Sequence, residues 1–162
     1  MPEWGYSIRE IDLDPEKTAK ASGREVRVSR KSTREVCRAI KGMMLAEAKR
    51  YLEDVMTMKK AVPFMKFKKK VGHRHGIEKG FAGRYPIKAA KQVLRILEGA
   101  EANAENKGLY TERLRIIHAS AYSGMKIKRY MPRAFGRSSP KFRTLCHIEI
   151  ALEEQPEIEE LL

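Results

Sequence analysis

Two segments near the end of the chain alternate apolar and polar residues and enclose a long stretch without acidic side chains. Residues 114–122 and 146–153 have the period of two that predicts β-strands. Between Glu112 and Glu149 the sequence contains nine Lys and Arg but no Asp or Glu. Because like charges that face each other across paired strands destabilise a hairpin, this segment requires a partner that carries many negative charges.

The intervening residues 124–145 predict an extended β-hairpin that projects from the body. If its arms continue the two strands to a turn near residues 134–136, each arm extends by about 30–35 Å. Aromatic residues and prolines stand between the cations, and the aromatic rings can stack on bases. An irregular basic loop is the alternative interpretation. The predicted RNA contacts in this segment are Lys126, Lys128, Arg129, Tyr130, Arg133, Arg137, Lys141 and Arg143.

The charge of the whole chain also favours a polyanionic partner. Lys and Arg number 34 against 21 Asp and Glu, which gives a formal net charge of +13. Nucleic acid is the first candidate for such a chain. The length of 162 residues suits one hydrophobic core, so we expect a single domain over residues 1–162.

Targeting signals and cysteine usage indicate a cytoplasmic protein. No apolar run approaches the roughly 20 residues of a membrane-spanning helix, and the first residues lack the layout of a signal peptide. Cys37 and Cys146 lie far apart without a Cys-x-x-Cys pair, so we expect buried, reduced thiols. We expect no membrane partner.

The first third of the chain predicts a strand followed by two helices. Residues 1–23 are interpreted as an extended lead-in, and the alternation in residues 25–29 predicts a short strand. Ser32 followed by Glu35 has the spacing of a capping box, which predicts a helix that begins near Ser32. Apolar residues three to four apart predict the buried faces of this helix and of the next. These residues are Val36, Ile40 and Met43 or Met44, and then Leu45, Ala48, Leu52 and Val55.

A third helix and an acidic end complete the body. Pro86 suits the first turn of a helix that ends before Gly108. Glu149 and the five acids of residues 153–162 are expected to form an acidic tail that frays and does not face RNA. The apolar stripe of the helix comprises Ala90, Val93, Leu94, Leu97, Ala100 and Ala104.

Residues 57–84 form a basic insertion in which cations crowd around four glycines and Glu78 is the only acid. We expect it to be mobile until it meets a compensating surface. Its glycines lack the order of a phosphate-binding nucleotide loop. His73 and His75 lack the Cys or carboxylate partners of a zinc site, so we expect contacts to phosphates or bases, no metal and no cofactor. The predicted RNA contacts are Lys59, Lys60, Lys66, Lys68, Lys69, Lys70, His73, Arg74, His75, Lys79 and Arg84.

Four more cations surround the start of the first helix. The positive end of a helix and its free backbone N–H groups suit a phosphate, although a solvated charged face is the alternative. His118 and His147 fall in strand patterns, where we expect hydrogen-bonded sheet or core histidines. The four cations are Arg27, Arg30, Lys31 and Arg34.

Residues 130–137, Tyr-Met-Pro-Arg-Ala-Phe-Gly-Arg, resemble the hairpin-tip motif of the large-subunit ribosomal protein L22 family (L22/L17e). Residues 146–149 (Cys-His-Ile-Glu) and 101–108 resemble the closing strand and the end of the long helix in its archaeal branch. Shorter stretches agree over nearly the whole chain, at residues 14–21, 32–35, 39–43 and 62–64. The basic insertion and Leu145-Cys146 depart from the bacterial pattern, which favours an archaeal source.

The resemblance implies an α+β fold in which three helices pack on a three-stranded antiparallel sheet. It also implies a structural constituent of the large ribosomal subunit that binds ribosomal RNA, supports assembly and contacts neighbouring ribosomal proteins. Its hairpin would line the polypeptide exit tunnel and face the nascent polypeptide, and we expect no homo-oligomer. The implied tunnel-lining residues are Met131, Pro132, Arg133, Ala134, Phe135, Gly136 and Arg137.

Two other classes of protein share the basic charge. An RNA-processing or RNA-modifying enzyme would need convergent acids, a metal set or a cofactor loop, and the sequence shows none of these. A chromatin-type DNA binder would not need a long acid-free ribbon. We therefore expect a structural RNA-binding protein and not an enzyme.

Overall fold

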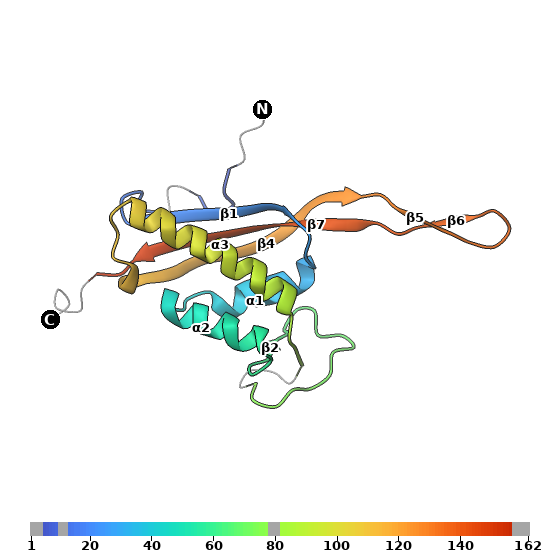
Figure 1. Ribbon diagram of the computed structural model, residues 1–162, viewed down its shortest axis with the longest axis horizontal. Coiled ribbons are helices and arrows are strands. Elements are labelled where there is room, and N and C mark those ends of the chain that lie inside the picture. The colour runs from blue at the N-terminus through green and yellow to red at the C-terminus, as the bar shows by residue number, and fades with distance from the viewer. Residues whose placement is uncertain (1–4, 10–12, 78–81, 157–162) are drawn as a thin grey trace.

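The central feature of the fold is a three-stranded antiparallel sheet with strand order β1-β7-β4 (Figure 1). The computed structural model describes residues 5–9, 13–77 and 82–156. Strand β7 (Arg143–Glu154) lies between β1 (Thr18–Val26) and β4 (Leu114–Ile127). Ile150 pairs with Ala21 on one side and with Ala119 on the other.

Three helices cover one face of this sheet, as expected (Figure 1). Helix α3 (Ile87–Asn106) packs on β1 and β7, α1 (Arg30–Ile40) packs on β4, and α2 (Leu45–Met56) packs on α3. A single turn of 3-10 helix, η2 (Thr111–Arg113), leads into β4. The fold is therefore α+β, and most of the predicted helical stripes are buried. Leu94 is only partly buried, and Met43 and Met44, predicted for the first stripe, lie beyond the end of α1, where Met43 is partly buried and Met44 is exposed.

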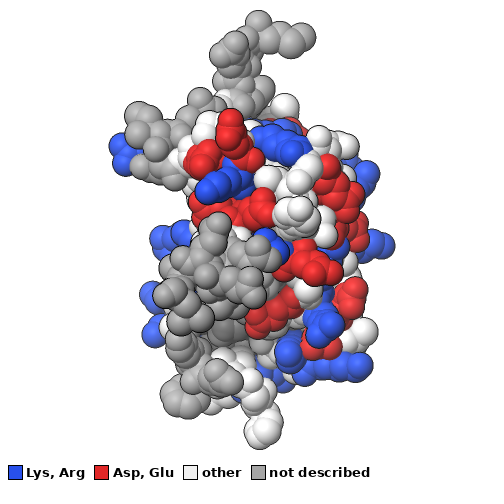
Figure 2. All heavy atoms as spheres, turned by 90° about the vertical axis from the view of Figure 1, so that its left-hand side faces the viewer, with Lys and Arg blue, Asp and Glu red and all other residues white. Residues whose placement is uncertain are grey.

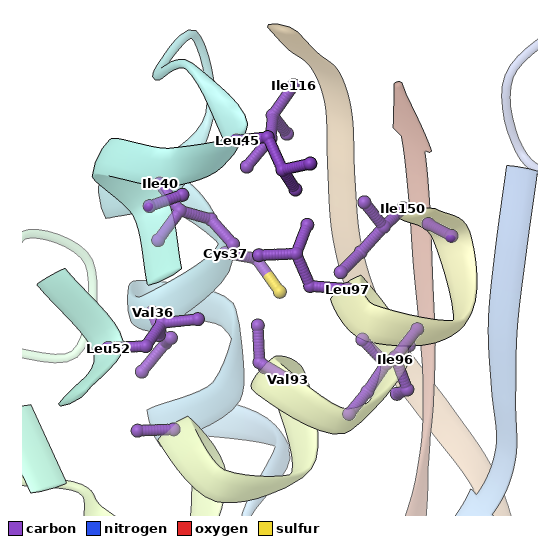
Figure 3. Packing of buried hydrophobic residues seen from close by; sticks show 14 of the residues in the cluster. Val36, Cys37, Ile40, Leu45, Leu52, Val93, Ile96, Leu97, Ile116 and Ile150 are labelled. Carbon is purple, nitrogen blue, oxygen red and sulfur yellow. The ribbon is translucent and has the colours of Figure 1, made fainter. Parts of the chain in front are cut away.

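The core lies between the helices and the sheet. Figure 3 shows Cys37 of α1 among side chains from α3 and the sheet. Burial raises the pKa of Cys37 to about 12 and that of Cys146 to about 11. Both thiols are free and buried, which confirms the prediction of buried cysteines.

Strand β1 corrects the predicted start of the fold. The strand expected at residues 25–29 occupies Thr18–Val26, so the predicted lead-in contains most of it. Its small residues hide the usual β-strand pattern, but they allow a close approach to α3. A Cβ on Gly23 would lie 2.5 Å from Cδ1 of Ile96, and such a contact is too short for any other residue to fit there unchanged.

The polar face of β7 is buried, which the sequence pattern did not predict. The alternation itself is confirmed. His147 and Glu149 are nevertheless only 5% and 0% exposed, because β7 has a strand on each side and residues 5–9 lie over its polar face. The prediction that Glu149 belongs to a frayed tail is wrong. Glu153 and Glu154 are also ordered at the end of β7, whereas residues 157–162 lie outside the described residues.

The predicted capping box is absent. Helix α1 begins at Arg30, and the side chain of its N-cap residue Ser29 makes no capping hydrogen bond. With Ser29 as the N-cap, Glu35 is the sixth helical residue and not the third, the position that a capping box requires. Its buried carboxylate accepts hydrogen bonds from the backbone N–H groups of residues 65–67 in the basic insertion.

The ends of the basic insertion are anchored to the body. Strands β2 (Val62–Pro63) and β3 (Gly83–Arg84) form an antiparallel pair, and the side chains of Val62 and Phe64 are buried. The insertion, which the sequence predicted to be mobile, is therefore anchored at its two ends. Between them the described chain is irregular and extends as a wide loop (Figure 1).

The long hairpin is present and projects from the body (Figure 1). Strands β4 and β7 remain paired as far as Ile127 and Arg143. Strands β5 (Tyr130–Pro132) and β6 (Ser138–Pro140) continue the ribbon to its tip. This regular pairing excludes the alternative of an irregular loop. None of the helices in the described part of the chain is long and apolar enough to cross a membrane.

Candidate nucleic-acid interface

The predicted RNA contacts fall on three surfaces. The hairpin surface comprises Tyr130 and the predicted cationic contacts of residues 126–143. The insertion surface comprises the predicted contacts of residues 59–84. The α1 surface comprises the four cations of residues 27–34. Every predicted contact that the structure describes is exposed, and Lys79 lies outside the described residues. Exposure of so many cations on one small protein is what phosphate binding requires.

The tip of the hairpin surface is a tight turn that presents an aromatic ring. The N–H of Arg137 donates to the carbonyl of Ala134 at 3.3 Å, and Phe135 and Gly136 both have positive φ, 57° and 67°. Phe135 is 93% exposed. A bulky residue in the left-handed region is strained and, when exposed, gains nothing from the fold of the isolated chain. The tip therefore presents an exposed aromatic ring from a strained turn.

The arms of the hairpin surface are stiffened by side chains. The guanidinium Nε of Arg133 donates to Oγ of Ser139 at 2.8 Å across the ribbon. Tyr130 and Phe142 pack edge to face, with ring centroids 6.0 Å apart. The backbone adds a further bond, since the N–H of Lys141 donates to the carbonyl of Arg129 at 2.6 Å, just before β5 begins and just after β6 ends.

The root of the hairpin is tied to the body by Glu25. Its two carboxylate oxygens lie 3.2 Å from the N–H of Met125, which donates to them. Nδ1 of His147 accepts from the N–H of Glu25 at 3.3 Å, and Nε2 of the same ring lies 3.2 Å from Oε1 of Glu25. One residue of β1 therefore reaches across β7 to β4 where the hairpin leaves the sheet.

The insertion surface is shaped by the Glu35 anchor and by aromatic rings under its cations. The cationic group of Arg84 lies 5.8 Å from the ring centroid of Phe64, and that of Arg74 lies 5.7 Å from that of Tyr85. Such contacts hold the side-chain stems while leaving the charged groups in solvent. The cations of the insertion are thus held on the outside of the protein.

The α1 surface joins the other two. The ammonium group of Lys31 lies 5.6 Å from the ring centroid of Phe67 in the insertion, and Nη1 of Arg30 donates to Oγ of Ser123 at the root of the hairpin at 3.5 Å. The first turn of α1 contains no acid. Cations at this end of a helix are repelled by its dipole, and a bound phosphate would remove that repulsion.

Acidic side chains gather away from the hairpin. Figure 2 shows the end of the body opposite the hairpin, where Asp and Glu are mixed with Lys and Arg over much of the described surface. The hairpin itself contains no acid. The charge of the molecule is therefore unevenly distributed along its length, as expected of a protein that binds a polyanion with one end.

The sheet face opposite the helices carries a polar cluster centred on Glu149. Its carboxylate accepts from the N–H and Oγ of Ser7, at 2.9 and 2.8 Å, and from the hydroxyl of Tyr122. Nη2 of Arg24 lies 3.3 Å from the same carboxylate. His118 hydrogen-bonds Ser7 and Ser120, and burial lowers its pKa. The cluster attaches residues 5–9 to the sheet, and both histidines are hydrogen-bonded as predicted.

No metal site accompanies these surfaces in the part of the chain that the structure describes. No group of three or more His, Cys, Asp or Glu is placed there to hold a metal ion. His73 and His75 are exposed on the insertion surface. The contacts described above for the α1 surface and the insertion surface hold cationic side chains on the outside of the protein.

Sequence reasoning missed one residue near these surfaces and did not single out another. Lys88 lies exposed in the first turn of α3, next to the hairpin root, but α3 was interpreted only as a core helix. Its signal was a cation two residues after Pro86, in the first turn of the helix, where an acid is favoured. Phe142 is 49% exposed beside Arg143. It is one of the hairpin aromatics that the sequence predicted to stack on bases, but it was not named as an individual contact.

A small α+β body with a long, exposed cationic hairpin defines an RNA-binding protein of the kind found in ribonucleoprotein particles. The family model described as Ribosomal protein L22p/L17e matches residues 21–153, and the chain belongs to this family. The family is structural and not enzymatic, so the enzyme alternative is excluded. The resemblance found in the sequence is thereby confirmed.

Similar proteins come from archaea. The large ribosomal subunit protein uL22 of Methanocaldococcus jannaschii is 57% identical over 144 residues, which cover 89% of this chain and 92% of the relative. That of Methanopyrus kandleri is 54% identical over 153 residues, 94% and 96% of the two chains. That of Archaeoglobus fulgidus is 55% identical over 140 residues, 86% and 90%. These relatives match the archaeal branch indicated by the sequence.

Proposed function

We propose that this chain is a structural constituent of the large ribosomal subunit that binds large-subunit ribosomal RNA and supports subunit assembly in the cytoplasm. The observation that carries this function is the projecting hairpin, whose predicted contacts are all exposed and which contains no acid. A lone two-stranded ribbon is marginally stable in water. Ribosomal RNA on both sides of it would neutralise its charge and bury its surface.

The tip of the hairpin lines the polypeptide exit tunnel and faces the nascent polypeptide. The exposed Phe135 in its strained turn supports this role. The mixed charges at the opposite end of the body suit neighbouring ribosomal proteins better than RNA. The protein acts as one copy in each subunit and not as a homo-oligomer.

Deletion of residues 131–137 tests the role of the tip. The core residues lie in the helices and in the body of the sheet, so the variant should fold as the wild type does. The remaining cations should keep most of the affinity for large-subunit RNA, because phosphate contacts supply much of it. Reconstituted large subunits should therefore form, but chemical probes and macrolide drugs that reach the tunnel wall should react differently with them.

Two outcomes would contradict this function at different levels. Normal assembly together with unchanged probe reactivity and drug binding in tip-deleted subunits would exclude a tunnel-wall role. A chain that sediments as a free pool, and not with large subunits, would contradict the ribosomal role altogether. A matched variant, Tyr110→Ala, removes an exposed aromatic residue from the η2 end of the body and should change none of these measurements.

A further inference from the structure

A groove of about 650 Å³ lies between the starts of α1 and α3 and the arm of the hairpin. We propose that this groove binds one unpaired nucleotide of the large-subunit RNA, with the base on its apolar floor and the phosphates on its cations. The proposal rests on the proposed RNA-binding function and assigns it a defined site. The residues that carry it are Arg27, Tyr85, Ile87, Lys88, Phe142 and Arg143.

The floor of the groove is apolar and open. Ile87 is 39% exposed and Phe142 is 49% exposed, and Tyr85 contributes a third apolar surface. Both rings are held from behind. Phe142 packs edge to face with Tyr130, and the guanidinium of Arg74 lies 5.7 Å from the ring centroid of Tyr85. Rings held in place at a solvent-filled groove are suited to stack on a base.

Three cations border this floor. Arg27, Lys88 and Arg143 come from three separate segments of the chain, and all three are exposed. The described residues that line the groove include no Asp or Glu. The groove therefore combines a surface for a base with charges for the phosphates on either side of that base.

The placement of Lys88 supports an anionic occupant. The first turn of α3 contains no acid, and neither does that of α1, whose N-cap residue Ser29 also lines the groove. A cation in the first turn of a helix opposes the helix dipole. The charge of Lys88 is therefore unfavourably placed in the isolated chain, whereas a phosphate in the groove would offset the repulsion from both helices.

The shape of the groove favours a single nucleotide over a duplex. A duplex would present its phosphates to the three cations, but its stacked bases would not reach the floor of a concave site. A nucleotide turned out of its stack would place its base among Tyr85, Ile87 and Phe142. Unpaired and extruded bases are the parts of RNA that proteins recognise by stacking.

Affinity measurements with full-length protein and whole large-subunit RNA test the site. Phe142→Ala should lower the affinity about tenfold without changing the slope of log K against log salt, because lost stacking releases no counterion. Lys88→Gln should reduce that slope by about the amount that one phosphate contact contributes. Phe142→Trp should keep wild-type affinity, since it restores a ring. Circular dichroism of each free variant should match that of wild type.

Fluorescence reports stacking directly. In a Trp4→Phe background, the tryptophan introduced by Phe142→Trp should be strongly quenched by RNA, while one introduced by Tyr110→Trp, at the η2 end of the body, should not. Wild-type affinity for Phe142→Ala with no quenching at position 142 would overturn the nucleotide site but leave the RNA-binding function intact. Failure of the wild-type chain to bind the RNA would overturn both.

Discussion

Removal of the Glu35 carboxylate should release the basic insertion from the body. Glu35 is 1% exposed and accepts hydrogen bonds of 3.1 Å from the N–H groups of Met65, Lys66 and Phe67. A hydrogen bond to a charged group contributes about 1.5–3 kcal/mol. The three bonds are not additive, because the released N–H groups can bind water. We therefore expect Glu35→Ala to lower the free energy of unfolding by about 2–4 kcal/mol.

Two measurements check this prediction. Urea unfolding followed by circular dichroism gives the stability change, and hydrogen exchange of the amides of residues 65–67 gives its location. Those amides should exchange faster, while the amides of α3 and β7 keep their relative protection. The control Glu98→Ala removes an exposed carboxylate from the middle of α3 and should change stability by less than about 0.5 kcal/mol.

A different pattern would refute the reasoning. If Glu35 acted as a capping-box residue, its loss would speed exchange in the first turn of α1 and leave residues 65–67 unchanged. Equal stability of Glu35→Ala and Glu98→Ala would show that the anchor contributes nothing. Glu35→Gln keeps one acceptor oxygen but points an NH₂ group at the same donors, so it should fall between wild type and Glu35→Ala.

Three further predictions concern charge, pH and thiols. Replacing Lys126, Lys128 and Arg129 together with Glu should weaken RNA binding and flatten its salt dependence without unfolding the body, as parallel binding and circular dichroism measurements would show. Burial lowers the pKa of His118 from its ordinary value of 6.5, as does the charge of Lys41. The unfolded chain therefore takes up this proton first, and stability to urea should fall as pH drops below 6.5, less so in His118→Gln. Because burial raises the pKa of Cys37 to about 12 and of Cys146 to about 11, neither thiol should react with iodoacetamide at pH 8 until urea unfolds the chain.

The sequence predicted the elements that have a strong local pattern. The apolar stripe of α3 and the alternation of β4 and β7 each continue over enough residues to distinguish a helix or a strand from a chance pattern. The hairpin was predicted for a different reason. Its lack of acids predicted that the two strands continue past the core, and the paired, largely exposed residues 126–143 confirm that arrangement.

The features that sequence reasoning missed depend on distant contacts. Strand β1 is formed by small residues because α3 lies directly on Gly23. Glu149 is buried because β7 becomes the central strand and residues 5–9 return over it. Glu35 has the spacing of a capping residue, but its carboxylate is used 30 residues away by the insertion. In each case the local pattern is ambiguous until the tertiary neighbours are known.

We expect Glu25, which contacts the root of the hairpin, to set the direction of the hairpin. Glu25 has a positive φ of 52°, and the pairing of β1 with β7 is irregular at this point, as is that of β4 with β7 next to Gly124. A Cβ on Gly124 would lie 2.7 Å from Oε1 of Glu25 and 2.9 Å from Nε2 of His147. Gly124→Ala should therefore displace the carboxylate that holds the N–H of Met125.

The expected result is a wider range of hairpin directions on an intact body. Spin labels on cysteines introduced at the exposed positions Arg137 and Tyr110 should show a broader distance distribution in Gly124→Ala and in Glu25→Ala than in wild type, because β4 and β7 alone would then hold the root. Gly99→Ala is the matched control, since its Cβ would meet nothing within 4 Å and should stabilise α3 by about 0.5–1 kcal/mol. Unchanged distributions in both root variants would show that strand pairing sets the direction of the hairpin without Glu25.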